Sequence, residues 1–160
     1  MRVLLTGMSG VGKSTLVAEL RRRGCLARDA DDDGFSEPRE DGRWGWRRER
    51  VAALLATATA ERPLYFAGCS EEQAELPFDY RVLLTAPRPV LVERLRTRAS
   101  DGHGGTEEEL AQVLDDLEHV EPLLRRSADL VLSGTVPAAE LADALLAAVG
   151  AQGASGASVP

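Results

Sequence analysis

The chain has 160 residues and a formal net charge of −7, a length that suits one domain with its own hydrophobic core. The acidic balance argues against a protein that binds nucleic acid through a basic surface, and no apolar run is long enough to span a membrane. With no secretory leader at its start and two isolated cysteines, Cys25 and Cys69, the chain is expected to be cytoplasmic, with both thiols reduced.

Short apolar strands alternate with helical patterns along the chain, which predicts a parallel sheet covered by helices on both faces. Five strands are expected, at residues 3–6, 25–28, 64–67, 81–85 and 130–132. Helices are expected at residues 13–23, 44–60, 87–98, 107–126 and 138–149. Residues 1–149 would form one domain, and residues 150–160 a disordered tail because they contain too little apolar surface to fold.

The first loop carries the pattern of a phosphate-binding P-loop, or Walker A motif. It reads GMSGVGKST and lies between a predicted strand and a predicted helix, the context that G-x-x-x-x-G-K-[ST] requires. Backbone N–H groups of such a loop point at a phosphate, and the helix N-terminus adds partial positive charge. ATP is therefore expected to bind at Gly7, Gly10, Val11, Gly12, Lys13, Ser14 and Thr15.

Two side chains of this loop have specific roles in such sites. Lys13 would reach the β- and γ-phosphates, and the Ser14 hydroxyl would bind Mg²⁺. Lys13 is also the only lysine of the chain, whereas arginine occupies every other basic position except the two histidines. A composition that retains a single lysine, and retains it here, supports a functional loop.

Aspartates crowd the segment after the second predicted strand, at positions 29, 31, 32 and 33. Like charges this close repel one another unless a cation or a ligand stabilises them. A carboxylate beside a transferred phosphoryl group can order a metal-bound water or accept a hydroxyl proton. Asp29 and Asp31 are the better candidates because they lie nearest the strand end, whereas Asp32 and Asp33 could simply be solvated.

With this loop and this D-x-D, the chain resembles the small P-loop kinases of the shikimate kinase and adenylate kinase group over residues 1–149. The resemblance implies a five-stranded sheet of order 2-3-1-4-5, with phosphate at the carboxyl end of the first strand. It also implies that Asp29 serves the metal through water, and that Asp31 serves the reacting hydroxyl or the acceptor.

The resemblance extends to the acceptor side of the site. Trp46-Arg47 is similar to an aromatic–Arg pair of shikimate kinases, in which the arginine grips the substrate carboxylate, and a guanidinium suits such a group. Trp46 could form a wall of the acceptor pocket or ordinary core. Gly68 stands where shikimate kinases carry a triple glycine, and is expected on the same side.

The later helix carries an R-x-x-x-R pattern similar to that of adenylate kinases. The resemblance implies that Arg94 lies along the adenine and that Arg98 meets the phosphates as a catalytic residue, together with Lys13, Asp29 and Asp31. Thr135 and Val136 follow the last strand, where these kinases cradle the adenine with backbone groups.

Two departures from the group's pattern keep other functions open. No acidic residue ends the strand at 64–67, and the break at 100–106, where the group has a lid, contains His103 but no lysine or arginine. The first hypothesis is an ATP- and Mg²⁺-dependent kinase for a small polar acceptor with an anionic group. The second is a nucleotide-binding regulator with slow ATPase activity, and the third, disfavoured by the net charge, is a nucleic-acid 5′-kinase or RNA-processing NTPase.

Overall fold

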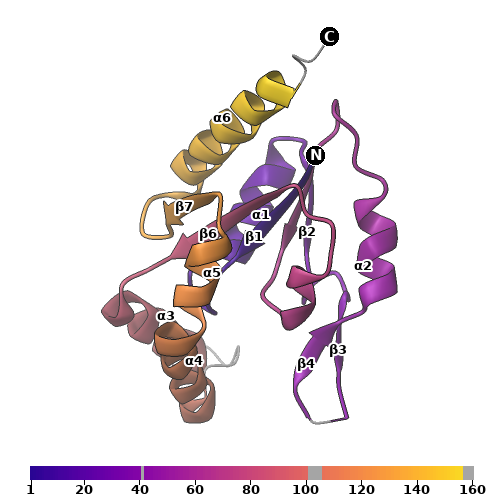
Figure 1. The fold of residues 1–160 in the computed structure, drawn as a ribbon. Helices are drawn as coiled ribbons and strands as arrows, with labels where there is room; N and C mark the ends of the chain where they lie inside the picture. Colours follow the sequence, from indigo (N-terminus) through magenta and orange to yellow (C-terminus); the bar gives the residue numbers. More distant parts are fainter. Residues whose placement is uncertain (41, 101–105, 157–160) are drawn as a thin grey trace.

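Five parallel strands form the centre of the protein in the computed structural model, which describes residues 1–40, 42–100 and 106–156 (Figure 1). The strands are β1 (Arg2–Thr6), β2 (Leu26–Asp29), β5 (Leu64–Ala67), β6 (Tyr80–Thr85) and β7 (Leu130–Ser133). Their spatial order is β2-β5-β1-β6-β7. Because a separate hairpin takes the numbers β3 and β4, this is the predicted order 2-3-1-4-5, and the predicted α/β class is confirmed.

Helices cover both faces of this sheet (Figure 1). They are α1 (Lys13–Arg22), α2 (Arg48–Leu55), α3 (Arg88–Ser100), α4 (Glu107–His119), α5 (Glu121–Ser127) and α6 (Ala138–Gly156), with a short 3₁₀ helix, η1 (Glu71–Ala74). Helices α1 and α6 pack against each other on one side of the sheet, while α2 lies on the other. No helix among the described residues is long and apolar enough to cross a membrane.

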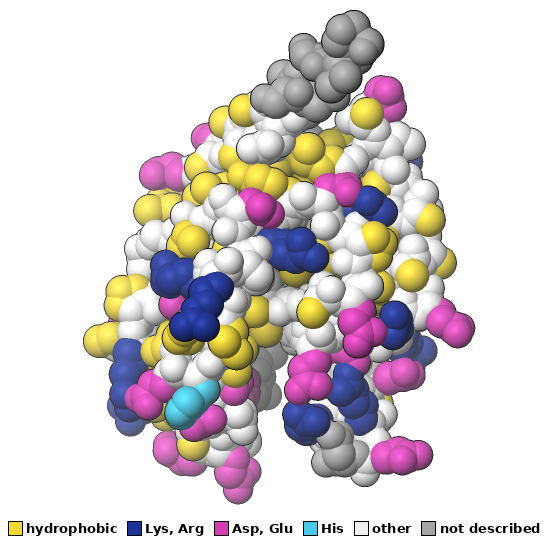
Figure 2. All heavy atoms as spheres, viewed as in Figure 1, with side chains coloured by type: hydrophobic (Ala, Val, Ile, Leu, Met, Phe, Trp, Pro, Cys, Tyr) yellow, Lys and Arg dark blue, Asp and Glu magenta, His cyan; other side chains and the backbone are white. Residues whose placement is uncertain are grey.

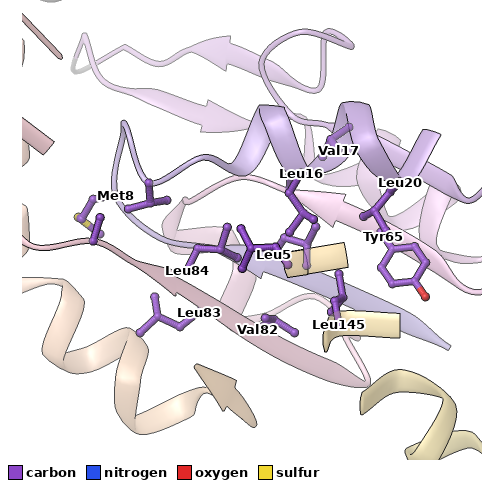
Figure 3. Packing of buried hydrophobic residues seen from close by; sticks show 14 of the residues in the cluster. Leu5, Met8, Leu16, Val17, Leu20, Tyr65, Val82, Leu83, Leu84 and Leu145 are labelled. Carbon is purple, nitrogen blue, oxygen red and sulfur yellow. The ribbon is translucent and has the colours of Figure 1, made fainter. Parts of the chain in front are cut away.

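Alternating side chains of the central strand β1 enter two different core clusters. Val3 and Leu5 belong to a cluster with Leu16 of α1 and Leu145 of α6, part of which Figure 3 shows around Leu5 and Leu84. Leu4 points to the opposite face and joins an aromatic cluster that also contains residues of α2. Both faces of β1 are therefore buried, as expected for the middle strand of a parallel sheet.

The predicted helix at 44–60 extends too far at its end, because α2 ends at Leu55, and it is also wrong at its start. Residues there form a two-stranded antiparallel hairpin of β3 (Ser36–Pro38) and β4 (Trp44–Trp46), and α2 begins only at Arg48. Side-chain burial alternates with a period of two residues here, as in a strand, because Trp44 is 68% exposed whereas Trp46 is 5% exposed. Sequence reasoning took the two tryptophans for helical residues.

Two other helices differ from their predicted bounds by more than two residues. The helix expected at 107–126 divides at Val120 into α4 and α5, with Pro122 in the first turn of α5, where a proline costs no backbone hydrogen bond. Helix α6 continues past residue 149 to Gly156, and residues 157–160 of the expected tail lie outside the described part. Residues 101–105 of the expected lid, His103 among them, also lie outside it.

Candidate active site

The P-loop leaves β1 at the carboxyl edge of the sheet and leads directly into α1. Gly7 has φ 142°, and a Cβ placed on it would lie 2.3 Å from the Leu84 carbonyl oxygen of β6, so this position requires glycine. Gly12 precedes α1 without a side-chain cap, and the first turn of α1 contains no acidic residue. The free N–H groups and partial positive charge of this helix end are thus left for an anion.

Lys13 lies over the loop that precedes it. Its Nζ donates hydrogen bonds to the carbonyl oxygens of Gly7 at 2.6 Å and Met8 at 3.0 Å. Burial lowers the pKa of the Lys13 ammonium, an effect that the nearby Cys69 and Asp29 oppose. A partly desolvated ammonium at the centre of the loop interacts strongly with any phosphate that reaches it.

Ser14 and Asp29 meet although they come from different elements. The Ser14 hydroxyl at the start of α1 donates to Asp29 Oδ2 at the end of β2, at 2.8 Å. The Asp29 side chain is only 5% exposed, and its other oxygen accepts the backbone N–H of Asp31 at 3.1 Å. The structure therefore brings together the two residues that were expected to hold the metal.

The other aspartates of this segment differ in their surroundings. Asp31 is exposed, and its Oδ1 accepts a hydrogen bond from Ser36 Oγ of the hairpin at 2.6 Å. Asp33 forms an ion pair with Arg21 and accepts the Asp29 backbone N–H at 2.8 Å, so it supports the turn rather than standing free in solvent. The negative charge of Asp29, followed by burial, raises the pKa of the Asp32 carboxyl.

Arg94 joins the P-loop to the loop between β7 and α6. Its guanidinium donates to the carbonyl oxygens of Gly10 at 3.0 Å and Gly134 at 2.8 Å. Gly134 itself rests against the P-loop, since a Cβ placed on it would lie 1.9 Å from the Val11 carbonyl oxygen. Two segments that are more than a hundred residues apart in the chain are thereby held in contact.

A cavity of about 960 Å³ contains most of these groups. Its described lining comes from the P-loop, the ends of β2 and β5, α3, α4 and the β7–α6 loop, and includes Lys13, Ser14, Asp29, Asp31, Cys69, Glu93, Arg94, Arg98, Asp116 and Val136. Figure 2 shows a groove in the lower half of the view, between the α4 side and the hairpin side of the molecule. A cavity of this size accommodates a nucleotide together with a small second substrate.

Other expected site residues lie outside this described lining. Trp46 packs edge-on against Phe66 with ring centroids 5.1 Å apart, as part of the aromatic core. Gly68 lies against the Trp46 ring, since a Cβ placed on Gly68 would be 2.8 Å from it. Arg47 is exposed, with Nε 3.5 Å from Glu37 Oε2, and the Thr135 hydroxyl lies 2.7 Å from that of Ser133.

Sequence reasoning missed several lining residues. Cys69 comes directly after the β5 end, and its place at the carboxyl edge of the sheet could have indicated it. Val90, Glu93 and Thr97 recur at helical spacing, so they lie on the same face of α3 as Arg94. That spacing could have predicted that the whole face lines the cavity, and not only its two arginines. Asp116 of α4 carries no local signal, because only the packing of α4 beside α3 brings it to the cavity.

The oxygen atoms of Ser14 and Asp29 fit the requirements of Mg²⁺. This ion prefers hard oxygen ligands and keeps several waters, so one hydroxyl and one nearby carboxylate suffice when phosphates supply the rest. Among the described residues, no group of three or more His, Cys, Asp or Glu side chains forms a metal site. One hydroxyl and one carboxylate suit an ion whose remaining ligands come from the phosphates of a nucleotide and from water.

The sequence of residues 3–115 matches the model of a protein family described as "AAA domain". Among curated proteins, no sequence match is found.

Solved structures with a similar fold include a gluconokinase from Sinorhizobium meliloti 1021, with a TM-score of 0.63 and 21% identity over 96% of this chain and 94% of that chain. A shikimate kinase from Acinetobacter baumannii in complex with shikimate has a TM-score of 0.63 and 22% identity over 94% and 93% of the two chains. A deoxyadenosine kinase from M. mycoides with bound dATP has a TM-score of 0.61 and 12% identity over 94% and 100%. At such identities the likeness establishes the fold, which is that of small P-loop kinases.

Proposed function

Because residues 3–115 match its family model, this chain belongs to the AAA domain family, and from that premise we propose that it is an ATP- and Mg²⁺-dependent phosphotransferase. It transfers the γ-phosphoryl group of ATP to a small polar acceptor, using the ATP of the cytoplasm. The observation that carries the proposal is the meeting of Ser14 and Asp29 at 2.8 Å beside Lys13, in a cavity that Arg98 also lines. Similar folds among small-molecule kinases support it.

Each side chain has a role that follows from its place. Lys13 and Arg98 neutralise charge on the phosphates, most strongly as charge spreads in the transition state. Ser14 and Asp29 would hold Mg²⁺, Asp29 through water, and the ion would add further charge neutralisation. Asp31, oriented by Ser36, accepts the proton of the acceptor hydroxyl.

The nucleotide base and the acceptor are bound at opposite sides of the phosphates. Arg94 and the backbone around Val136 border the base, on the α3 and β7–α6 side of the cavity. The acceptor enters on the side of Asp31 and Cys69. An anionic group on the acceptor would have to meet a cation other than Arg47, which pairs with Glu37 away from the described lining.

An acceptor screen tests this proposal. ADP release from ATP–Mg²⁺ is followed with panels of polyols, hydroxy acids, nucleosides and oligonucleotides, and product phosphorylation is checked by mass spectrometry. We expect one small-molecule panel to stimulate ADP release and to yield a phosphorylated product. Lys13→Ala serves as the inactive control, and slow ADP release that no panel stimulates would contradict the kinase.

A regulator with slow ATPase activity is the second candidate. It is favoured by the end of β5, where Gly68, Cys69 and Ser70 supply no carboxylate for the metal. The nucleic-acid kinase is disfavoured by the net charge of −7, and because three of the four arginines of residues 43–50 pair with carboxylates. Arg43 contacts Glu71, Arg47 contacts Glu37, and Arg48 contacts Glu75.

A further inference from the structure

The short helix η1 lies between the two halves of the candidate site. It follows the end of β5, where the register between β1 and β5 stops at the pair Leu5 and Ala67. Beyond this pair β1 continues through Thr6 into the P-loop, and the chain after β5 continues through Gly68 into η1. Contacts of η1 are therefore in a position to join the P-loop to the acceptor side.

Two adjacent residues of η1 face different neighbours, because successive side chains of a 3₁₀ helix point about 120° apart. Gln73 Oε1 accepts a hydrogen bond from Thr6 Oγ1 at 3.0 Å, and Thr6, only 3% exposed, is the last residue of β1 before Gly7. Glu72 instead forms an ion pair with Arg39, the residue after β3. It also accepts a hydrogen bond from the backbone N–H of Trp46 in β4 at 3.4 Å.

The β3–β4 hairpin is also joined to the aspartate segment. Ser36, the first residue of β3, donates to Asp31 at 2.6 Å. A continuous set of contacts thus runs from Asp31 through the hairpin to Glu72, and from Gln73 through Thr6 to Gly7. Both ends of this path are groups that line the cavity.

From these contacts we infer that Gln73 is a positioning residue for phosphoryl transfer, which keeps the P-loop in register with the hairpin that orients Asp31. This role rests on the proposed kinase function. Transfer requires the reacting atoms to be held in near-attack geometry, and a displacement of about 1 Å can lower the rate by about 100-fold. Nucleotide binding depends on the P-loop together with Arg94 and the β7–α6 loop, and not on the hairpin, so it is expected to tolerate such a displacement.

Gln73→Leu tests the inference. We expect about a tenfold lower kcat for nucleotide turnover, with the nucleotide Kd within about twofold of the wild type. Faster hydrogen exchange is expected in the peptide that spans β1 and the P-loop. Glu75→Gln is the matched control on the same turn, since Glu75 pairs only with exposed Arg48 among the described contacts, and it should change none of these quantities.

A double variant separates positioning from stability. In Gln73→Leu alone the buried Thr6 hydroxyl loses its partner, whereas Thr6→Val with Gln73→Leu removes both polar groups and should restore the Tm. The double variant is expected to keep the low kcat and fast exchange, whereas Thr6→Ser, which retains the hydroxyl, should keep the wild-type kcat although the loss of a buried methyl group lowers its Tm. Recovery of kcat together with Tm in the double variant would overturn the inference. Should the wild-type chain show no turnover at all, the kinase proposal and the positioning role fail together, and the exchange of the β1 peptide then decides only whether Gln73 holds the P-loop in place.

Discussion

Around the P-loop, side chains bind the backbone: Lys13 and Arg94 both donate to main-chain carbonyl oxygens of the loop. Around the β3–β4 hairpin, by contrast, several contacts join pairs of exposed side chains, such as Arg43 with Glu71 and Arg47 with Glu37. Backbone contacts persist when neighbouring side chains change, whereas an exposed ion pair is weak and easily replaced. The half of the cavity at the P-loop, proposed for the nucleotide, is thus the more constrained one, whereas the half beside the hairpin, proposed for the acceptor, depends on side-chain pairs that are easily replaced.

Of the variants that test this comparison, Lys13→Ala is expected to have the largest effect, on the affinity for ATP–Mg²⁺. The variant removes the ammonium that contacts the loop and would meet the phosphates, so affinity for ATP–Mg²⁺ should fall by about 100-fold or more. Calorimetry measures the affinity, and circular dichroism should show an unchanged fold. Arg96→Ala, on the exposed side of α3, is the control that keeps wild-type affinity. Equal affinities in the Lys13 variant and the wild type would remove the basis for the P-loop assignment.

Gly134→Ala tests whether the backbone contact between the two loops matters. The new methyl group would lie 1.9 Å from the Val11 carbonyl oxygen, so the β7–α6 loop must move away from the P-loop. We expect the free energy of unfolding to fall by about 1–3 kcal/mol and nucleotide affinity by about tenfold. Gly150→Ala in α6 is the control without steric conflict, because no described atom outside its own helix lies within 4 Å of the added Cβ; it should leave the affinity unchanged and raise the free energy of unfolding slightly through helix propensity. Denaturant titration and calorimetry measure both quantities, and a neutral result at position 134 would contradict the close contact.

Two arginines of α3 divide the nucleotide half further. Arg98 lines the cavity and is expected to meet the phosphates, so Arg98→Ala should lower kcat by about tenfold with a smaller change in nucleotide Kd. Arg94 binds Gly10 and Gly134, so Arg94→Ala should mainly weaken nucleotide binding and lower the Tm. Steady-state kinetics measures the kcat of both variants, and binding titrations measure their nucleotide Kd. The opposite pattern would mean that the two roles are exchanged along the helix.

The smallest effect is expected at Arg47. Its ion pair with Glu37 is exposed on both sides, and such pairs contribute about 0–1 kcal/mol. Arg47→Ala should therefore change acceptor KM by no more than about twofold, while Asp31→Asn lowers kcat by about tenfold. Kinetics with whichever acceptor the screen identifies measures both. A large rise in acceptor KM in the Arg47 variant would restore the interpretation of Arg47 as the group that grips an anionic acceptor.

The same division explains what the sequence could predict. The glycines and Lys13 of the P-loop encode a local backbone path, so their motif is visible over nine consecutive residues. The meeting of Ser14 with Asp29 was also predictable, since both stand at the carboxyl edge of a parallel sheet. In contrast, Trp46 and Gly68 pack on each other across a gap in the sequence, and no local pattern distinguishes such core packing from a pocket wall.

Partners that are distant in the chain account for most of what was missed. The hairpin is held by Glu71 and Glu72, which follow it by more than twenty residues and sit on a helix of a single turn. Neither the turn nor its pairing has a sequence signature of its own. Gln73 is a similar case, because its link to Thr6 joins residues 67 positions apart.

A chain with a single lysine has a useful experimental property. Apart from the chain's own N-terminus, Lys13 carries the only primary amine, and its Nζ lies between the carbonyl oxygens of Gly7 and Met8. Selective isotope labelling of lysine would therefore place one side-chain resonance in the NMR spectrum, with no assignment needed beyond that of the residue type. That resonance would report directly when an anion enters the loop, and it would distinguish bound ADP from bound ATP without any engineered probe.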